Sequence, residues 1–106
     1  MKTYKLSDMK GGWIVGGFEP TVYSTTDCEV AVKSYSAGDK EGAHYHKVAT
    51  EITCIVSGTV IMCNQIFKSG DVIVLSPGDV TSFEAITDAV TTVVKLPGVL
   101  DDKYIV

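Results

Sequence analysis

The only two histidines of the chain are separated by one residue, in His44-Tyr45-His46. Alternate side chains of a β-strand share a face, so two imidazoles at this spacing can converge on one point. Glu51 follows His46 by five residues, at the start of an apolar stretch. Two imidazoles and a carboxylate suit a divalent transition metal and leave coordination positions open. We therefore predict that His44, His46 and Glu51 bind one such ion (Fe, Mn, Ni or Zn).

The competing interpretation is a pair of surface histidines near a surface glutamate, because short motifs often match by chance. The metal interpretation needs Glu51 to lie beside the histidines. We expect a short turn over residues 47–50 to place the strand that starts at Glu51 alongside the histidine strand.

Short runs rich in Val, Ile, Thr and Tyr must position these residues. Glycines and prolines separate the runs, and no stretch has a helical period over eleven residues or more. Many short strands at close spacing are typical of an all-β sandwich or barrel. The runs 51–56 and 59–63, joined by Ser57-Gly58, are predicted to form a hairpin. Further strands are predicted at 28–36, 66–67, 71–75, 81–86 and 89–96.

Glycines frame the candidate ligands at a fixed spacing, Gly38-x5-His44-x-His46-x4-Glu51-x6-Gly58. This spacing resembles the first signature motif of the cupin superfamily at all five of its fixed positions. Residues 70–78 begin with Gly-Asp and end with Pro-Gly, which looks like the second cupin motif. The resemblance covers roughly residues 30–96. It implies a double-stranded β-helix jelly-roll barrel, with the three ligands pointing inward.

The second motif departs from the family pattern at one position. Cupins usually supply a further histidine three residues after the Pro-Gly glycine, and here Thr81 stands there. Threonine is a poor ligand for a divalent metal. Either the metal is held by three protein ligands with an extra open position, or it binds weakly and the barrel works without it. We favour the first, because three good ligands still form a recognised facial site.

Strand alternation also identifies candidate pocket-lining residues. Thr53 and Ile55 share the parity of the inward-facing glutamate, and Thr81 and Phe83 share a parity with each other. Tyr35 lies on the run before the first motif and shares a face with Lys33. Tyr35 is either a pocket acid or base or a core tyrosine. The predicted lining is therefore Tyr35, Thr53, Ile55, Thr81 and Phe83, and no general base stands out.

We predict one domain over residues 1–106, with an N-terminal arm (1–27), a barrel core (28–97) and a C-terminal segment (98–106). Asp101-Asp102 is expected to be solvated. The arm carries Trp13, Ile14 and Phe18 between glycines. Apolar groups of this size need a cover, and sheet edges must also be covered. We expect a homodimer that uses the arm; the alternative is that the arm folds back on its own barrel.

The net charge of −4 and the pI of about 4.9 argue against a nucleic-acid or membrane partner. Three cysteines without a CxxC motif argue against a disulfide framework, and reduced cysteines fit a cytoplasmic protein. Two functions remain open, because the cupin fold hosts many. One is a metal-dependent enzyme, of dioxygenase or isomerase/lyase type, acting on a small oxygen-rich molecule. The other is a non-catalytic module that binds a sugar or an organic acid.

Overall fold

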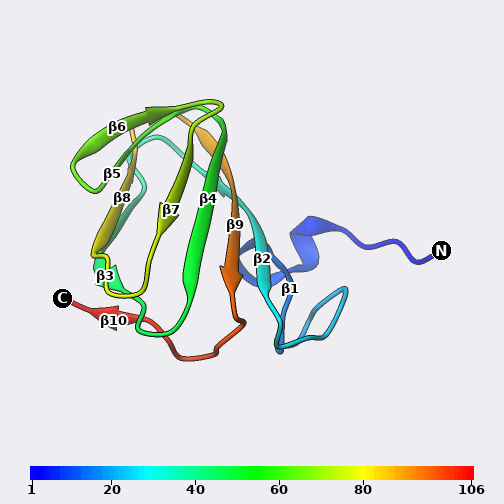
Figure 1. Cartoon of the computed structure of the whole chain (residues 1–106). Coiled ribbons are helices and arrows are strands. Elements are labelled where there is room, and N and C mark those ends of the chain that lie inside the picture. Colours follow the sequence, from blue (N-terminus) through cyan, green and yellow to red (C-terminus); the bar gives the residue numbers. More distant parts are fainter.

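The computed structural model describes all residues 1–106 and folds them into two five-stranded antiparallel sheets that face each other (Figure 1). This is the predicted all-β jelly-roll barrel. The first sheet has the order β1 (Trp13–Val15), β2 (Glu29–Tyr35), β9 (Ala89–Leu96), β4 (Thr50–Ser57) and β7 (Val72–Leu75). The second has the order β10 (Tyr104–Ile105), β3 (Lys40–Tyr45), β8 (Thr81–Ala85), β5 (Thr59–Met62) and β6 (Gln65–Lys68).

Burial alternates along the central strands, as expected for strands with one face on the core. In β4, Glu51, Thr53 and Ile55 are buried, and β8 and β9 alternate in the same way. Seven inward-facing apolar residues form the hydrophobic core: Ile55, Val60, Met62, Leu75, Phe83, Ala85 and Ala89. The buried polar residues His44, Glu51 and Thr81 lie toward the end of the barrel where β3 ends and β4 and β8 begin, whereas Thr91 is level with Ile55.

The predicted hairpin of residues 51–56 and 59–63 is wrong. β4 pairs with β9 and β7 in the first sheet, whereas β5 pairs with β6 and β8 in the second. Gly58 carries the chain from one sheet to the other with φ +90°, where a Cβ would lie 2.3 Å from the Asp88 carbonyl oxygen. The hairpin is instead β5–β6, whose turn has Cys63 and Asn64 at φ 51° and 61°, the positive values of a type I′ turn.

The expected pairing of the histidine strand with the glutamate strand is also wrong. β3 pairs with β8 and β10 in the second sheet, while β4 lies in the first. Residues 46–49 therefore cross between the sheets, and His44 and Glu51 face each other across the barrel. The ligands still approach one another, because both strands direct these side chains inward.

The N-terminal arm extends the first sheet of its own barrel. After two short 3₁₀ turns, η1 (Leu6–Asp8) and η2 (Lys10–Gly12), β1 pairs antiparallel with β2, with Trp13 opposite Ala31. The arm thus lies against β2, as Figure 1 shows. No helix in the structure has the length and apolar character needed to cross a membrane.

Candidate metal and ligand site

Backbone carbonyl groups hold both histidine rings. His44 lies in β3 and His46 directly after it, both are buried, and their ring centroids are 5.5 Å apart. Nδ1 of His44 is 3.0 Å from the carbonyl oxygen of Gly42, and Nδ1 of His46 is 2.6 Å from that of Asp102. A carbonyl oxygen only accepts, so each Nδ1 carries the proton. In the neutral rings, each Nε2 then keeps the lone pair that a metal ligand needs.

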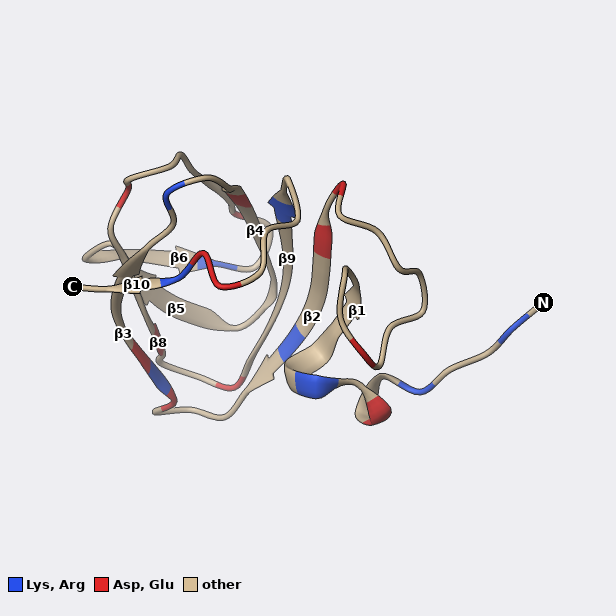
Figure 2. Ribbon diagram, turned by 90° about the horizontal axis from the view of Figure 1, so that it is seen from below, with Lys and Arg blue, Asp and Glu red and all other residues tan.

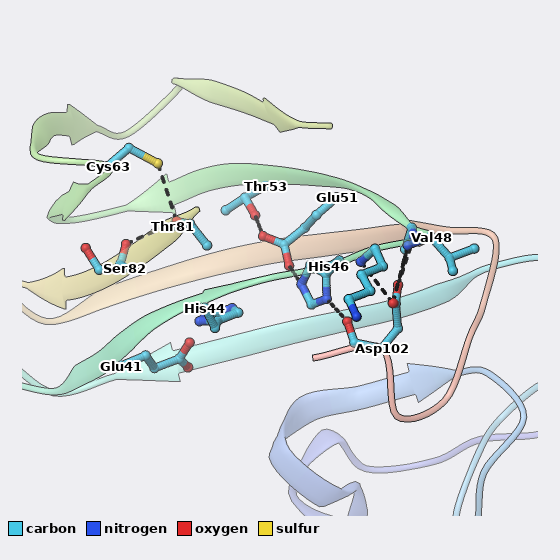
Figure 3. Close-up of polar contacts among 12 residues, drawn as sticks. Glu41, His44, His46, Val48, Glu51, Thr53, Cys63, Thr81, Ser82 and Asp102 are labelled. Carbon is cyan, nitrogen blue, oxygen red and sulfur yellow. Dashed lines mark hydrogen bonds and ion pairs between the residues drawn. The ribbon is translucent and has the colours of Figure 1, made fainter. Parts of the chain in front are cut away.

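The carboxylate of Glu51 lies against His46 (Figure 3). Its Oε1 is 3.5 Å from Nε2 of His46, which is buried and makes no hydrogen bond. Two ligand atoms bound to one ion at about 2.0–2.2 Å each lie at most about 4.4 Å apart. The pair therefore has a separation that one ion can bridge. Thr53 donates a hydrogen bond of 3.2 Å to Oε2 and orients the carboxylate.

His44 completes the candidate set only in part. It is buried in the same region, its ring edge-on to that of His46 at 76°. No group of three or more His, Cys, Asp or Glu side chains in the structure is placed so that it could hold a metal ion. The arrangement brings together the orphaned Nε2 of His46 and a carboxylate oxygen of Glu51, with the ring of His44 in the same region.

Thr81 lies next to His44, because the two residues are paired between β8 and β3. Its side chain is buried, its hydroxyl donates to the carbonyl of Ser82 at 3.2 Å, and it accepts from the Cys63 thiol at 3.5 Å. The position that the family resemblance assigns to a further histidine is therefore on the same inward face as His44. A hydroxyl engaged in this way adds no metal ligand.

Asp102 corrects the expectation of a solvated C-terminal segment, because it is only 5% exposed. Its carboxylate accepts hydrogen bonds from the backbone N–H groups of Lys47, Val48 and Ala49 at 3.0, 3.1 and 2.9 Å. Burial by itself would raise the pKa of Asp102, but these donors and the nearby His46 lower it below its usual value. Asp102 thus fixes both the crossing loop and, through its carbonyl group, the ring of His46.

A cavity of about 180 Å³ opens beside His44 and Glu51. Four of the five predicted lining residues line it: Tyr35, Thr53, Thr81 and Phe83. Ile55 also faces inward, but it is fully buried within the hydrophobic core and does not reach the cavity. His46 is not among the lining residues. The cavity therefore gives a ligand access to His44 and Glu51.

Several residues that line the cavity were not predicted from the sequence, among them Trp13, Lys33, Glu41, Lys95 and Lys103. Strand parity alone could have identified Lys33, because it shares a face with Tyr35. The others depend on tertiary structure. Lys95 enters the site because β9 pairs its residue 95 with Glu51, and Trp13 enters because β1 joins the sheet edge.

Tyr35 and Glu41 form a polar pair in the cavity wall. The Tyr35 hydroxyl donates to Oε1 of Glu41 at 3.3 Å, and its ring packs on Phe83 with centroids 4.3 Å apart. Burial raises the pKa of Tyr35 well above its usual range, and the Glu41 carboxylate raises it further. Burial likewise lowers the pKa of Lys33, which the Glu41 charge opposes. Tyr35 is therefore a protonated hydrogen-bond donor at neutral pH.

Solved structures with this fold are numerous, whereas no protein-family model and no curated protein sequence matches the chain. An uncharacterized protein with a double-stranded β-helix domain from Klebsiella pneumoniae aligns at 19% identity and TM-score 0.69. The alignment covers 92% of this chain and 85% of that chain.

Two further solved structures, of proteins with a described function or bound metal, share the fold. A sugar phosphate isomerase from a cupin superfamily, from Silicibacter pomeroyi, aligns at 22% identity and TM-score 0.62, over 66% of this chain and 50% of that chain. The bacterial pirin YhhW from Escherichia coli, in complex with nickel(II), aligns at 14% identity and TM-score 0.69, over 82% and 39%. Together with the two-sheet barrel and the inward-facing motif residues, these likenesses show that the chain has the double-stranded β-helix fold of the cupins.

Proposed function

We propose that this protein binds one divalent transition metal through His44, His46 and Glu51 and acts as an enzyme on a small oxygen-rich molecule. The observation that carries the proposal is the buried, unpartnered Nε2 of His46, 3.5 Å from Oε1 of Glu51. A buried polar atom without a partner is costly unless a ligand satisfies it. The cavity beside Glu51 and His44 has room for a substrate next to such an ion.

The chain's own residues prepare this site. The carbonyl groups of Gly42 and Asp102 hold the two imidazoles with Nε2 free, and Thr53 orients Glu51. When bound, the metal supplies a Lewis acid or, if it is iron, a site for O₂ and substrate together. Thr81 leaves one side of the site without a protein ligand. Tyr35 presents a phenol to the cavity, held by Glu41.

Solved neighbours support an enzymatic role for the fold without identifying the reaction. The Silicibacter protein is described as a sugar phosphate isomerase, and a Thermotoga maritima protein with 26% identity and TM-score 0.57 as a predicted oxalate decarboxylase. Both descriptions concern small oxygen-rich molecules. We infer an isomerase/lyase or dioxygenase type of reaction.

A non-catalytic binding module is the second candidate, and one observation favours it. Both histidines of the chain are assigned to the metal, and the raised pKa of Tyr35 removes that residue as a base at neutral pH. Only Glu41 remains in the cavity as a carboxylate outside the candidate ligand set. A barrel of this kind can bind a sugar or an organic acid through the metal without transforming it.

Metal content tests the proposal. The protein, purified without a histidine tag or chelators, is expected to hold one equivalent of Fe, Mn, Ni or Zn by elemental analysis. His44→Ala, His46→Ala and Glu51→Gln should lose it, whereas Glu41→Gln, which changes a cavity carboxylate outside the ligand set, should retain it. One full equivalent in both histidine variants would place the metal elsewhere and refute the assignment.

The identity of the metal separates the two candidate functions. Iron, with O₂ consumption on a diol or a keto acid, favours the enzyme. Zinc or nickel that only raises the melting temperature favours the binding module. We place the protein in the cytoplasm, a proposal supported by three cysteines that all remain unpaired.

A further inference from the structure

We propose that the cavity binds its ligand through an anionic group, a carboxylate or a phosphate, held by Lys33 and Lys95 beside Trp13. This inference rests on the proposed function, since it names the class of molecule that the same cavity takes. The proposed ligand is a small molecule that carries an oxyanion. Its anionic group lies at the lysines, and its other oxygen atoms point toward His44 and Glu51.

The two lysines converge on one aromatic ring. Nζ of Lys33 lies 5.2 Å from the ring centroid of Trp13, and Nζ of Lys95 lies 5.0 Å from it. Both residues are half-buried and line the cavity, together with Lys103. The cation–π contacts keep both ammonium groups near the ring. Both ammonium groups therefore lie near the indole, at the wall of the cavity.

No carboxylate oxygen lies within ion-pair distance of either ammonium group. The ion pair between a lysine and a carboxylate in this structure joins Lys40 to Glu84. At longer range the charges of Glu41 and Glu51 act on Lys33, and Lys95 acts on Glu29. The cavity does contain Glu41 and Glu51. However, Glu41 accepts from Tyr35, and Glu51 accepts from Thr53 and lies against His46. The lysines are thus free to bind an anion from solution.

The distribution of charge makes this placement unusual. The chain carries a net charge of −4 and has only nine lysines and no arginine. Three of those lysines line this one cavity. Figure 2, which looks along the strands, shows basic segments on β2, at the end of β9 and just before β10. A positive cavity wall in an acidic protein attracts small anions to that site.

A neutral hydroxyl lies beside Lys33 in the cavity wall. Thr91 lines the cavity and is 1% exposed. It is paired with Lys33 between β9 and β2, so both side chains rise from the same position of the sheet. Burial raises the pKa of Tyr35, and the Thr91 hydroxyl is close enough to the Tyr35 phenol to lower that pKa by a smaller amount. Thr91 therefore adds a polar group to the Lys33 end of the cavity wall.

Trp13 is the only tryptophan of the chain, so tryptophan fluorescence reports on the surroundings of this one ring, which also borders a second hollow beside Lys95 and Lys103. The test titrates metal-stripped protein, at constant ionic strength, with inorganic phosphate, with glycolate and with the neutral analogue ethylene glycol. Isothermal calorimetry repeats each titration, so that binding without a fluorescence change is still detected. We expect saturable binding of phosphate or glycolate and none of ethylene glycol. The tighter of the two anions identifies the group.

Four variants assign the site. Lys33→Gln and Lys95→Gln should each weaken anion binding by about tenfold or more, the loss expected for a hydrogen bond to a charged group. Lys33→Arg keeps the charge and should retain binding. Lys68→Gln removes an exposed lysine on β6 and should leave affinity unchanged. Thermal melts followed by circular dichroism confirm that each variant is folded.

Two results would overturn the proposal: no saturable binding of either anion by both methods, or unchanged affinity in folded Lys33→Gln and Lys95→Gln. A failure of the metal assignment can be distinguished from a failure of the anion site. His44→Ala removes the metal but leaves the lysines in place, so anion binding that survives in this variant supports the lysine site whatever the metal content shows.

Discussion

The two histidine rings are hydrogen-bonded to carbonyl groups at very different distances along the chain. Nδ1 of His44 is paired with Gly42, two residues away in the same strand, whereas Nδ1 of His46 is paired with Asp102. The second support comes from the C-terminal segment, which crosses the end of the barrel in Figure 2. The support of His46 therefore depends on docking of this segment, in which Asp102 contacts residues 46–49 and β10 pairs with β3.

Replacing that carboxylate should destabilise the protein. Asp102→Asn removes the charge and turns one acceptor oxygen into a donor that faces backbone N–H groups. Because hydrogen bonds to charged groups contribute about 1.5–3 kcal/mol each, we expect a loss of about 3 kcal/mol in the free energy of unfolding, measured by urea denaturation. The matched control is Asp101→Asn, at an exposed neighbour, which should change stability by less than about 0.5 kcal/mol. Equal effects of the two variants would contradict the role of Asp102.

Thr81 allows a gain of function to be tested. Thr81→His places an imidazole beside His44, on the face that lines the cavity. A fourth ligand should raise metal affinity by about tenfold or more, since one added ligand contributes more than about 1.4 kcal/mol, measured by competition with a chelator. Ser82→His, one residue along the same strand and on the opposite face, serves as the control. Unchanged affinity in Thr81→His would mean that residue 81 does not face the metal.

At the scale of strands, alternation predicted which way side chains point but not which strands pair. Thr53, Thr81 and Phe83 face inward as the period of two requires. Which strands pair depends on residues far apart in the sequence. The run after Ser57-Gly58 has the pattern of the second strand of a hairpin, but the chain crosses to the opposite sheet at Gly58.

The crossing at Gly58 can be tested against a glycine of the same conformation. Gly58 and Gly70 have φ values of +90° and +95°, but a Cβ at Gly58 would lie 2.3 Å from the Asp88 carbonyl oxygen, and one at Gly70 would meet nothing within 4 Å. Gly70→Ala should cost only the conformational strain, about 1–2 kcal/mol. Gly58→Ala should cost more than about 4 kcal/mol or prevent folding. Thermal unfolding of both variants measures the difference, and equal melting temperatures would show that the close approach is absent.

Lys33 and Lys95 show why part of the site could not be predicted from the sequence. Lys33 and Lys95 lie 62 positions apart in the printed sequence, and no short motif links them. They meet because β2 and β9 are neighbours and β1 adds Trp13 at the edge. The candidate metal ligands, in contrast, lie within one eight-residue stretch, and their spacing in the sequence suggests them.

At the scale of the whole molecule, one broad surface lacks a cover. The outward positions of β9, β4 and β7 carry no charged side chain, and the cross-strand rows are Val94–Ile52–Val74 and Thr92–Cys54–Val72. Val72 and Val74 are 60% and 59% exposed. The N-terminal arm pairs with β2, at the opposite edge of the sheet from β7. An apolar face of this kind is typical of an interface.

We expect a second copy of the chain to cover this face. Two identical flat faces pack on each other about a two-fold axis, the commonest symmetry of soluble homo-oligomers. Such a pair buries about 800 Å² per partner in a standard interface. We therefore expect the homodimer to form through this face of the first sheet, while Trp13 stays in its own cavity.

Light scattering at micromolar concentration measures this directly. The wild-type protein should have twice the 11.3 kDa mass of one chain. Val74→Lys places a charge in the centre of the uncovered face and should produce monomers, because an unpaired buried charge is strongly unfavourable. Ile66→Lys introduces the same charge at a residue of similar exposure, 62%, on β6 of the other sheet, and should leave the dimer intact. A wild-type mass of one chain would refute the dimer, and dissociation by Ile66→Lys alone would move the interface to the second sheet.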